Sequence, residues 1–480
     1  MKKILSILLI AVFLTVLLTP LASAALLGVD ASGAPQLKNY ISLSALFDNR
    51  QNSSRFFDDS EAFVSDAMPI KNRVLDFGSL IQSKLLKSTS ANVVTGRDGY
   101  LFSTEELDSE MSEEEILAVA DTVNQINDYC KSKGVKFVLA VAPNKSTALK
   151  SKLPYYAKSR CNSNYDRVLE LIEDKGCIAD LRPALSEQSD YYHKTDTHWN
   201  NLGAEKAYEV IMQSVGRQAK SYDSLEFKKE YIWQGDLTDL LYPAEKPISD
   251  FQYTSDFYDE LSQRFIITER KDKRKFDNRA YLDYITMDRD NKVLSAATAN
   301  GNEQGSLLML RDSFGRALIP YMIDSFGNAE FLISSGILDA YSNDLEGVDC
   351  LVLEIAERKL SQLTEGTQQF EAAETQVPEA EVKTDAHNTL YTANDFGYYE
   401  LYGTLSEKMK GKVTVVLSDG DSRFAYRALK NSYTAENMPE GTVCDYYLSS
   451  RFESLKSGKY SVEVISNGVS SGNIGEIIIE

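Results

Sequence analysis

Helix-like and strand-like patterns of apolar residues alternate along the chain from residue 112 to residue 356. Ser112 and Glu115 have the spacing of a capping box, apolar residues then recur at helical intervals, and Gly134 is suited to end the helix. The continuous apolar run from Val135 to Pro143 has the length of a buried parallel strand. Further helices are predicted in YDRVLELIEDKG, NLGAEKAYEVIMQSV and FGRALIPYMIDSF, and further strands in CIADL, SLLMLRD, EFLIS and VDCLVLEIA. This alternation predicts a doubly wound α/β domain with a mostly parallel sheet flanked by helices.

Three other stretches depart from this pattern. Residues from about 221 to 305 are rich in Tyr, Asp and Lys without a clear period, which indicates an insertion over the α/β core. Residues 364–388 are acidic and poor in large apolar side chains, which is typical of a linker. Residues 389–480 contain short β-type runs separated by Gly, Asp, Asn and Ser, and these predict a small β-sandwich.

The chain begins with the features of a secretory signal. Two lysines precede an apolar run from Ile4 to Leu18, and small residues follow up to Ala24, after which cleavage is expected. An uncleaved membrane anchor is the alternative, although the run is short for a span of about 20 residues. We therefore expect a signal peptide at 1–24, an N-terminal extension at 25–89 and an extracytoplasmic protein that is secreted, periplasmic or held at the cell surface.

The composition limits the classes of protein to which this chain can belong. A chain of 480 residues is expected to form roughly two or three domains. An apolar fraction of 43% and a charged fraction of 25% argue against wholesale disorder. The net charge of −20 argues against nucleic acid as a general partner, because phosphate binding needs a basic face. Among the five cysteines, Cys161 and Cys177 are close enough in sequence to pair, or each is a small buried residue.

Histidine is rare, yet two of the three histidines lie in one short segment, YYHKTDTHWNNLGA. There a single residue separates Asp196 from His198, just before a predicted helix. Ser313 lies between a predicted strand and a predicted helix, at the sheet edge where α/β proteins place their active sites. A serine hydroxyl needs a base to take its proton, and His198 can be that base while Asp196 fixes its tautomer. The three residues are therefore candidates for a catalytic triad.

These residues also have structural explanations. An Asp-Ser pair before a helix has the composition of an N-cap, and His198 could be a buried, hydrogen-bonded histidine beside Trp199. A metal site built from His193, Asp196 and His198 would lack a further histidine nearby, so we expect no metal. We expect no other cofactor either.

Six separated motifs resemble, in their order, those of the SGNH-hydrolase-like family that includes the alginate O-acetylation proteins and their DHHW-type relatives. The motifs are VTGRDGYLF, VAPNKSTALKSKLP, DLRPAL with YYHKTDTHWNNLGA, QGDLTDLL, RDSFG and VDCLVLEIAERKL. Agreement of several separated motifs is more specific than any one of them. The resemblance implies an SGNH-like α/β catalytic domain at 90–363, and by motif the family's triad falls on Asp196, His198 and Ser313.

The resemblance also implies a function. It implies an extracytoplasmic O-acetyltransferase that passes acetyl to hydroxyls of a cell-surface or secreted polysaccharide through a serine acyl-enzyme. A polysaccharide is then the acceptor, and a membrane-bound O-acyltransferase is a candidate acetyl donor. We expect Asn144, Lys145 and Tyr321 to contact the substrate. A carbohydrate acetylesterase differs only in that water takes the acyl group, and a non-catalytic polysaccharide-binding or assembly factor is a further alternative.

The β-sandwich at 389–480 falls where some relatives carry a carbohydrate-binding module. Its tyrosines either stack on sugars or form the core of the sandwich. These tyrosines are Tyr398, Tyr399, Tyr402, Tyr426, Tyr446 and Tyr447.

One position departs from the family pattern. Relatives commonly have glycine before the Asp-Ser pair, where this chain has Arg311. A long side chain there either crowds the acyl pocket or points into the substrate cleft.

Overall fold

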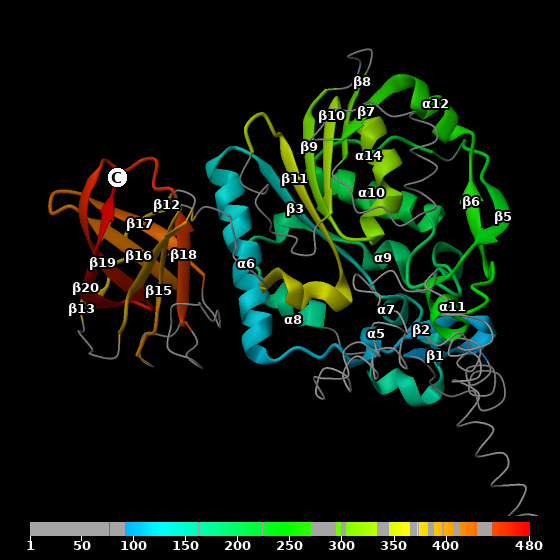
Figure 1. Cartoon of the computed structure of the whole chain (residues 1–480), viewed down its shortest axis with the longest axis horizontal. Coiled ribbons are helices and arrows are strands. Elements are labelled where there is room, and N and C mark those ends of the chain that lie inside the picture. The colour runs from blue at the N-terminus through cyan, green and yellow to red at the C-terminus, as the bar shows by residue number, and fades with distance from the viewer. Residues whose placement is uncertain are drawn as a thin grey trace, which may run out of the picture.

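The computed structural model of the protein describes residues 76, 92–160, 164–222, 224–269, 294–298, 304–333, 345–364, 372, 374–382, 388–395, 398–406, 412–429 and 444–480. The expected signal peptide at 1–24 and the N-terminal extension at 25–89, apart from Asp76, lie outside these residues. The described residues form an α/β domain and, beside it, a smaller module made of strands (Figure 1).

A seven-stranded sheet forms the centre of the α/β domain. Its strand order is β4-β3-β11-β9-β10-β8-β7. From β4 to β10 all neighbours pair in parallel, whereas β8 and β7 pair antiparallel at one edge. The strands are β3 (Lys136–Ala142), β4 (Ile178–Asp180), β7 (Phe265–Glu269), β8 (Leu294–Thr298), β9 (Ser306–Arg311), β10 (Asn328–Ile333) and β11 (Cys350–Ala356). The mostly parallel sheet is confirmed, and the expected insertion at about 221–305 contributes its two antiparallel edge strands.

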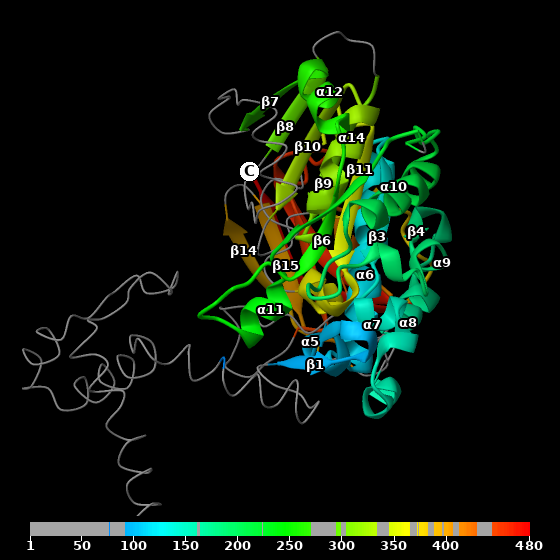
Figure 2. The same ribbon diagram turned by 90° about the vertical axis from the view of Figure 1, so that its right-hand side faces the viewer.

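Helices cover both faces of this sheet, as Figures 1 and 2 show. On one face, α6 (Glu113–Ser132) and α8 (Asn164–Leu171) share a buried cluster with Leu139 of β3. On the other face, α10 (Asn201–Val215) and α14 (Ile319–Ser325) share a second cluster with Ala140. Because successive strand residues point to opposite faces, a continuous apolar strand such as β3 supplies both cores. The α/β domain is therefore doubly wound, as predicted.

Local sequence signals fix the ends of these helices. The Ser112 side chain accepts a hydrogen bond from the backbone N–H of Glu115 at 3.1 Å, and Glu115 accepts one from the Ser112 N–H at 2.7 Å. Gly134 follows α6 with a φ of +71°, in the left-handed region that favours glycine. The helix predicted in FGRALIPYMIDSF is interrupted: a 3₁₀ helix, η8 (Phe314–Leu318), precedes α14. Pro320 explains the break, because a residue without an N–H is tolerated only in a first helical turn.

Shorter elements complete the domain. Several of them follow the carboxyl ends of the parallel strands and bring together the segments that hold the candidate site. They are β1 (Val93–Thr95), η3 (Arg97–Gly99), β2 (Leu101–Ser103), α5 (Glu105–Asp108), α7 (Lys145–Ala148), η4 (Lys150–Lys152), η5 (Tyr155–Arg160), η6 (Lys175–Cys177), α9 (Arg182–Leu185), η7 (Ser189–Tyr191), β5 (Lys228–Trp233), α11 (Asp236–Leu241), β6 (Asp250–Thr254), α12 (Phe257–Arg264) and η9 (Glu357–Thr364). None of the helices in the described ranges has the length and apolar character that crossing a membrane requires.

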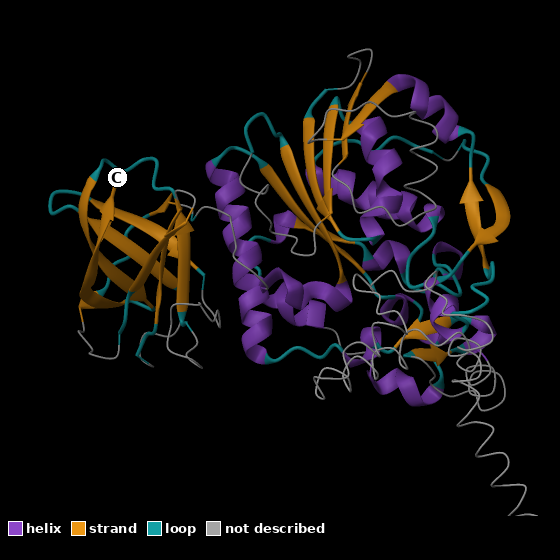
Figure 3. Ribbon diagram, in the orientation of Figure 1, coloured by secondary structure: helices purple, strands orange, loops and turns teal. Residues whose placement is uncertain are grey.

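The C-terminal module consists of two sheets that enclose one apolar core (Figure 3). The larger sheet has the order β12-β17-β16-β19-β20-β13 and the smaller one β14-β15-β18. The strands are β12 (Glu374–Thr375), β13 (Glu381–Val382), β14 (Tyr391–Asp395), β15 (Tyr398–Gly403), β16 (Val413–Ser418), β17 (Arg423–Ala428), β18 (Tyr446–Ser450), β19 (Gly458–Ser466) and β20 (Val469–Ile479). Of the tyrosines considered for sugar stacking, the side chain of Tyr398 lies outside the described set, and the others are buried: Tyr399, Tyr402, Tyr426, Tyr446 and Tyr447. These five belong to the interior and offer no exposed ring to a sugar.

Part of the stretch expected to be a linker belongs to the larger sheet. Within 364–388, β12 pairs with β17 and β13 pairs with β20. The sheet therefore begins before residue 389, because backbone hydrogen bonds compensate for the lack of apolar side chains there. The other domain boundaries stay predictions.

Arg427 joins the C-terminal module to the α/β domain. Its guanidinium lies 2.9 Å from carboxylate oxygens of Asp121 and Asp128 on α6, and 3.1 Å from Glu173 after α8. The Arg427 side chain is only 4% exposed. A buried guanidinium is costly unless it is paired, and here carboxylates from the other domain supply the pairing. Lys412 adds a more exposed ion pair to Glu173.

We expect Arg427→Gln to lower the free energy of unfolding of the C-terminal module by about 1–2 kcal/mol, because it removes the cation that three partly exposed carboxylates share. Calorimetry should then show the module melting at a lower temperature than the α/β domain. Arg423→Gln is the matched control, because Arg423 pairs with Glu463 inside the module and is 48% exposed. Its effect should stay within about 0.5 kcal/mol. Equal effects of the two substitutions would contradict a clamp at Arg427.

Candidate active site

The structure brings Asp196, His198 and Ser313 together. His198 Nε2 lies 2.7 Å from Ser313 Oγ, and His198 Nδ1 lies 2.6 Å from Asp196 Oδ1. The expected convergence is therefore present in the geometry. With Nδ1 donating to the carboxylate, Nε2 is left to accept the proton of the serine hydroxyl.

The sequence left open whether the Asp-Ser pair is a helix cap or part of a catalytic triad, and in the structure the side chains of Asp312 and Ser313 make different contacts. Asp312 performs the capping: its carboxylate accepts hydrogen bonds from the N–H groups of Phe314 and Ala356, both at 2.8 Å. The Ser313 side chain makes no cap hydrogen bond at the start of η8. Ser313 also has ordinary helical dihedral angles, with φ −68° and ψ −24°. The cap explanation thus applies to Asp312, and the Ser313 hydroxyl is directed to His198.

The carboxylate of Asp196 is buried and surrounded by donors. Its Oδ1 accepts from the backbone N–H of His198 at 2.9 Å as well as from the imidazole. Its Oδ2 accepts from Trp233 Nε1 and from the backbone N–H of Asp236, both at 3.0 Å. Burial opposes ionisation, but the charge and hydrogen bonds of His198 outweigh it and hold the pKa of Asp196 well below its usual range. The carboxylate is therefore ionised and its orientation is fixed.

Lys145 holds the loop that carries Asp196, which corrects the expectation that it contacts substrate. Its ammonium group lies 3.2 Å from the carbonyl oxygens of His193 and Lys194 and 2.5 Å from that of Asp196. The side chain is completely buried, and burial lowers the pKa of Lys145. An ammonium group has three protons, and three carbonyl oxygens accept them. Lys145 therefore has no donor left for a sugar.

Tyr321 and Asn144 also lie inside the protein. Tyr321 is fully buried on α14, and its hydroxyl donates to the carbonyl of Asn201 at 2.9 Å, so the expected substrate contact is wrong for this residue. Asn144 follows β3 at the carboxyl edge of the sheet, and its Oδ1 accepts from the Arg358 N–H at 3.2 Å. Its expected contact with substrate stays a prediction.

The segment expected to be an insertion closes over the Asp196 loop. Trp233 at the end of β5 stacks face to face on His193, with ring centres 4.4 Å apart and an angle of 4° between the rings. Burial lowers the pKa of His193 to about 4, so this ring is neutral at pH 7. A side-chain carbon on Gly235 would lie 2.2 Å from the Thr195 carbonyl oxygen, so only glycine permits this approach. The motif QGDL was visible in the sequence, but the donors at Trp233 and Asp236 were missed.

Asp236 places a second carboxylate near the imidazole. Its Oδ2 lies 3.8 Å from His198 Nδ1, and it accepts hydrogen bonds from the N–H and hydroxyl of Thr197 at 2.8 and 2.6 Å. Burial, with the nearby charge of Asp196, raises the pKa of Asp236. Possible metal ligands of Asp196, His198 and Asp236 lie within 4.8 Å of one another, a set that differs from the one considered with His193. Because these groups already hydrogen-bond to one another or to Thr197, we assign them to orienting the imidazole.

Arg311 takes neither of the two positions expected for it. It is 1% exposed, and its Nη1 donates to the Asp312 carbonyl at 3.1 Å. The side chain of Arg311 and the carboxylate of Glu354 fill the space beside Gly315, where an added side-chain carbon would meet both at 2.6 Å. Burial, then the charge of Asp312, raises the pKa of Glu354 well above its usual range. Arg311 is thus part of the packing under the turn and does not face an acyl pocket.

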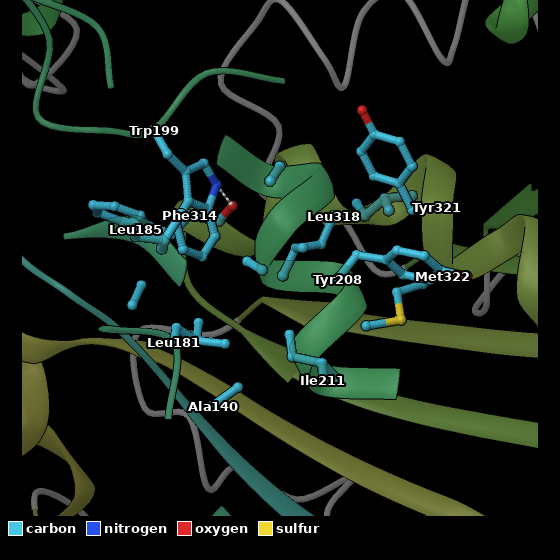
Figure 4. Close-up of a cluster of buried hydrophobic side chains, with 14 of the residues drawn as sticks. Ala140, Leu181, Leu185, Trp199, Tyr208, Ile211, Phe314, Leu318, Tyr321 and Met322 are labelled. Atoms are coloured by element: carbon cyan, nitrogen blue, oxygen red, sulfur yellow. Dashed lines mark hydrogen bonds between the residues drawn. The ribbon is translucent and has the colours of Figure 1, made fainter. Parts of the chain in front are cut away.

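Aromatic side chains pack against the imidazole of His198. Phe314 lies 4.6 Å from His198 between ring centres, and Trp199 meets Phe314 edge-on at 5.1 Å. Trp199 Nε1 donates to the Phe314 carbonyl at 3.0 Å, the dashed line in Figure 4. The two halves of the site, residues 196–199 and 312–315, are therefore joined by a hydrogen bond and ring packing as well as by the contact between His198 and Ser313.

Comparison with known proteins tests the resemblance. Residues 93–260 match the SGNH hydrolase-like domain of the acetyltransferase AlgX family. The resemblance seen in the motifs is thereby confirmed. The matched stretch of this SGNH hydrolase-like domain includes Asp196 and His198 and ends before Ser313, so the placement of Ser313 rests on the geometry described above.

Individual relatives of the SGNH hydrolase-like domain are distant. The chain is 26% identical over 255 residues to a probable alginate O-acetylase, AlgJ, of Pseudomonas syringae pv. tomato, covering 50% of this chain and 61% of that protein. It thus spans about three fifths of that relative's length. Among solved structures, PatB1 of Bacillus cereus matches with a TM-score of 0.45 and 19% identity over 58% of this chain and 99% of that one. A DHHW family protein from Eubacterium siraeum matches with a TM-score of 0.44 and 17% identity over 57% and 93%.

We expect Trp233→Phe to lower kcat/KM for a chromogenic acetyl ester roughly tenfold to a hundredfold. The phenyl ring can still stack on His193, but Asp196 Oδ2 loses one of its donors in a buried position. Tyr231→Phe on the same strand is the control, because its hydroxyl donates to Ile248 at an exposed position. Turnover unchanged in Trp233→Phe would contradict a role for the indole N–H.

The pKa of Glu354 predicts a pH dependence of stability. Because the pKa of Glu354 is raised in the folded protein, the folded protein keeps a proton that the unfolded chain releases above a pH of about 4.5. This contribution is fully present below that pH and is lost as the pH rises through the folded-state pKa. The glutamine side chain of Glu354→Gln does not ionise. The melting temperature of this variant, relative to that of the unchanged protein, should therefore increase as the pH rises from 4 to 8. A difference that is constant across this range would contradict the assignment.

Proposed function

We propose that the protein is an extracytoplasmic O-acetyltransferase that acts on a polysaccharide through an acetylated Ser313. The observation that carries the proposal is the pair of short contacts at His198, 2.7 Å to Ser313 Oγ and 2.6 Å to Asp196 Oδ1. The match of residues 93–260 to the acetyltransferase family supports the reaction type. The AlgJ relative, a probable alginate O-acetylase, supports a polysaccharide as the acceptor class.

In the first half-reaction Ser313 Oγ attacks the carbonyl carbon of an acetyl ester. His198 Nε2 takes the hydroxyl proton as the new C–O bond forms, and the ionised carboxylate of Asp196 stabilises the imidazolium. Breakdown of the tetrahedral intermediate breaks the bond to the donor oxygen, which receives the proton from His198. The products are the donor alcohol and acetyl-Ser313.

In the second half-reaction a sugar hydroxyl takes the place of the donor alcohol. His198 removes its proton while its oxygen attacks the acetyl carbon, and the proton then returns to Ser313 Oγ as the serine ester breaks. If water enters instead, the same steps give acetate, and the protein is an esterase. The acceptor therefore decides between the two activities.

Location and donor complete the proposal. The N-terminal pattern of two lysines, an apolar run and small residues up to Ala24 supports export from the cytoplasm. A membrane-bound O-acyltransferase could supply the acetyl group from the membrane side, as the family resemblance implies. Asp196, His198 and Ser313 themselves require neither a metal nor a nucleotide for this chemistry.

We expect Ser313→Ala to abolish formation of the acyl-enzyme while the melting temperature changes little. The substitution removes the oxygen that becomes acylated, and that side chain makes no cap hydrogen bond. Mass spectrometry after incubation with a chromogenic acetyl ester, with and without oligosaccharide acceptors, measures the acetylated protein and the acetylated sugar. Full activity of Ser313→Ala would contradict the proposal. Acetate without acetylated sugar would identify an esterase, and an inert native protein would identify a non-catalytic binder.

Asp196→Asn should retain a small activity, lower by roughly 10³- to 10⁴-fold. An asparagine amide cannot accept hydrogen bonds at both former carboxylate oxygens, so it conflicts with the donors at His198, Trp233 and Asp236. The imidazole then loses its fixed tautomer, while Ser313 and the substrate site remain. Rates of ester turnover compared with those of Ser313→Ala measure this difference, and equal rates for the two variants would contradict it.

A further inference from the structure

Arg316 connects the turn at Ser313 to the segment expected to be an insertion. It lies in η8, shortly after Ser313 in the sequence, and it is 7% exposed. Its guanidinium carbon lies 5.6 Å from the ring centre of Trp233, within the range of a cation–π contact. Trp233 ends β5, which pairs with β6, so the two residues come from segments that are far apart in the sequence. The turn that carries the serine therefore places a positive charge against the hairpin of β5 and β6.

The indole of Trp233 makes different contacts at its edge and at its face. At the edge, Nε1 donates a hydrogen bond to Asp196 Oδ2 at 3.0 Å. Over the face lie the guanidinium of Arg316 and the imidazole of His193, whose ring centre is 4.4 Å from that of the indole. The His193 ring is neutral at pH 7, because burial lowers its pKa to about 4. Of these two groups at the face of the indole, Arg316 is therefore the one that carries a charge.

A cation at the face of an indole affects the N–H at its edge. The face of an aromatic ring is negative and its edge is positive, so a cation over the face draws the π electrons toward itself. The N–H then carries more positive charge and becomes a better hydrogen-bond donor. Polar groups in series polarise one another in this way inside proteins, where the low dielectric constant strengthens electrostatic interactions. A fixed cation over the ring also opposes rotation of the indole away from its acceptor.

From this geometry we propose that Arg316 is a positioning residue, which keeps the indole N–H of Trp233 directed at Asp196 and strengthens it as a donor. The inference rests on the proposed function, in which Asp196 orients His198 and stabilises the imidazolium. Asp196 Oδ1 faces the imidazole, so a strong donor at Oδ2 keeps the carboxylate from turning away. A guanidinium keeps its charge at every relevant pH, so the effect of Arg316 is the same across the pH range of the reaction.

The first test is spectroscopic and needs no substrate. The chain has two tryptophans, Trp199 and Trp233, so labelling tryptophan with ¹⁵N gives one indole N–H signal for each, and Trp233→Phe identifies the signal of Trp233 by removing it. Arg316→Met keeps a long side chain without a charge, and it should move the proton signal of Trp233 upfield, as a weaker hydrogen bond requires. Arg316→Lys keeps a cation and should leave this signal close to its position in the unchanged protein.

The second test is a double-mutant cycle on turnover of a chromogenic acetyl ester. Arg316→Met should lower kcat roughly threefold to tenfold and leave KM unchanged, because it weakens a group that acts through Asp196 and does not alter substrate binding. In a Trp233→Phe background the same substitution should lower kcat by less than about twofold, because a phenyl ring has no N–H to strengthen. Arg316→Lys should retain at least about a third of the original kcat, because the charge is kept.

Arg217→Gln is the control for loss of an arginine beside a ring. Its guanidinium lies 4.4 Å from the ring centre of Phe326, and it donates to the carbonyl of Gln304 just before β9, at the opposite end of that strand from Ser313. This variant should change neither kcat nor the Trp233 signal. An unchanged Trp233 signal in Arg316→Met, or an equal loss of kcat with and without the indole, would overturn the inference. If Arg316→Met does not fold, Arg316→Gln, which keeps a hydrogen-bond donor without the charge, takes its place in both tests.

The two tests separate this inference from the proposed function. The indole signal is recorded without substrate, so an upfield shift in Arg316→Met that Arg316→Lys does not show supports the interaction through Trp233 even in a protein that turns over no ester. In that case the transferase proposal fails and the positioning of the indole by Arg316 stands. Ester turnover with a kcat that Arg316→Met leaves unchanged has the opposite meaning, because it leaves the proposed function intact and overturns the role of Arg316.

Discussion

The burial of one negative charge, on Asp196, organises the surroundings of the candidate site. Burying a carboxylate in a protein interior is affordable only when donors surround it. Here the donors come from the imidazole and backbone of His198, the indole of Trp233 and the backbone of Asp236. Each of these must approach within hydrogen-bonding distance, so the conformation of β5, the start of α11 and the loop before α10 all follow from this requirement. The buried ammonium of Lys145 holds the same loop from its carbonyl side.

A second buried group of charges lies under the serine. Asp312 accepts from two backbone N–H groups, while Arg311 and Glu354 fill the space that the absent side chain of Gly315 leaves. The two charge groups have different functions. The Asp196 group orients the imidazole of His198, and the group around Asp312 fixes a turn of the backbone. The two groups are connected by the serine–imidazole hydrogen bond, by the hydrogen bond from Trp199 to Phe314 and by the packing of Phe314 against Trp199 and His198.

Much of this arrangement could be predicted from the sequence because it is encoded locally. The capping box at Ser112, the apolar run of β3 and the Asp-Ser pair between strand and helix are short patterns with direct structural meaning. What failed depends on contacts between distant segments. A lysine beside a strand looks like a substrate contact, and only the fold shows that Lys145 is enclosed by three carbonyl oxygens. Trp233 and Asp236 lie in a stretch without periodicity, and the donor at Asp236 is a backbone N–H that no sequence pattern identifies.

The two hydrogen bonds of the candidate triad differ greatly in the length of chain that they close. Asp196 and His198 are two positions apart, whereas His198 and Ser313 are separated by 115. Closing a long loop costs more conformational entropy than closing a short one, and here it also requires the central strands to be in register. During folding the oriented imidazole can therefore form early, but the serine meets it only after β9 and β11 have joined the sheet. The hydroxyl thus stays an ordinary alcohol in every unfinished chain, and the contact on which the proposed acyl transfer depends exists only in molecules that have completed their fold.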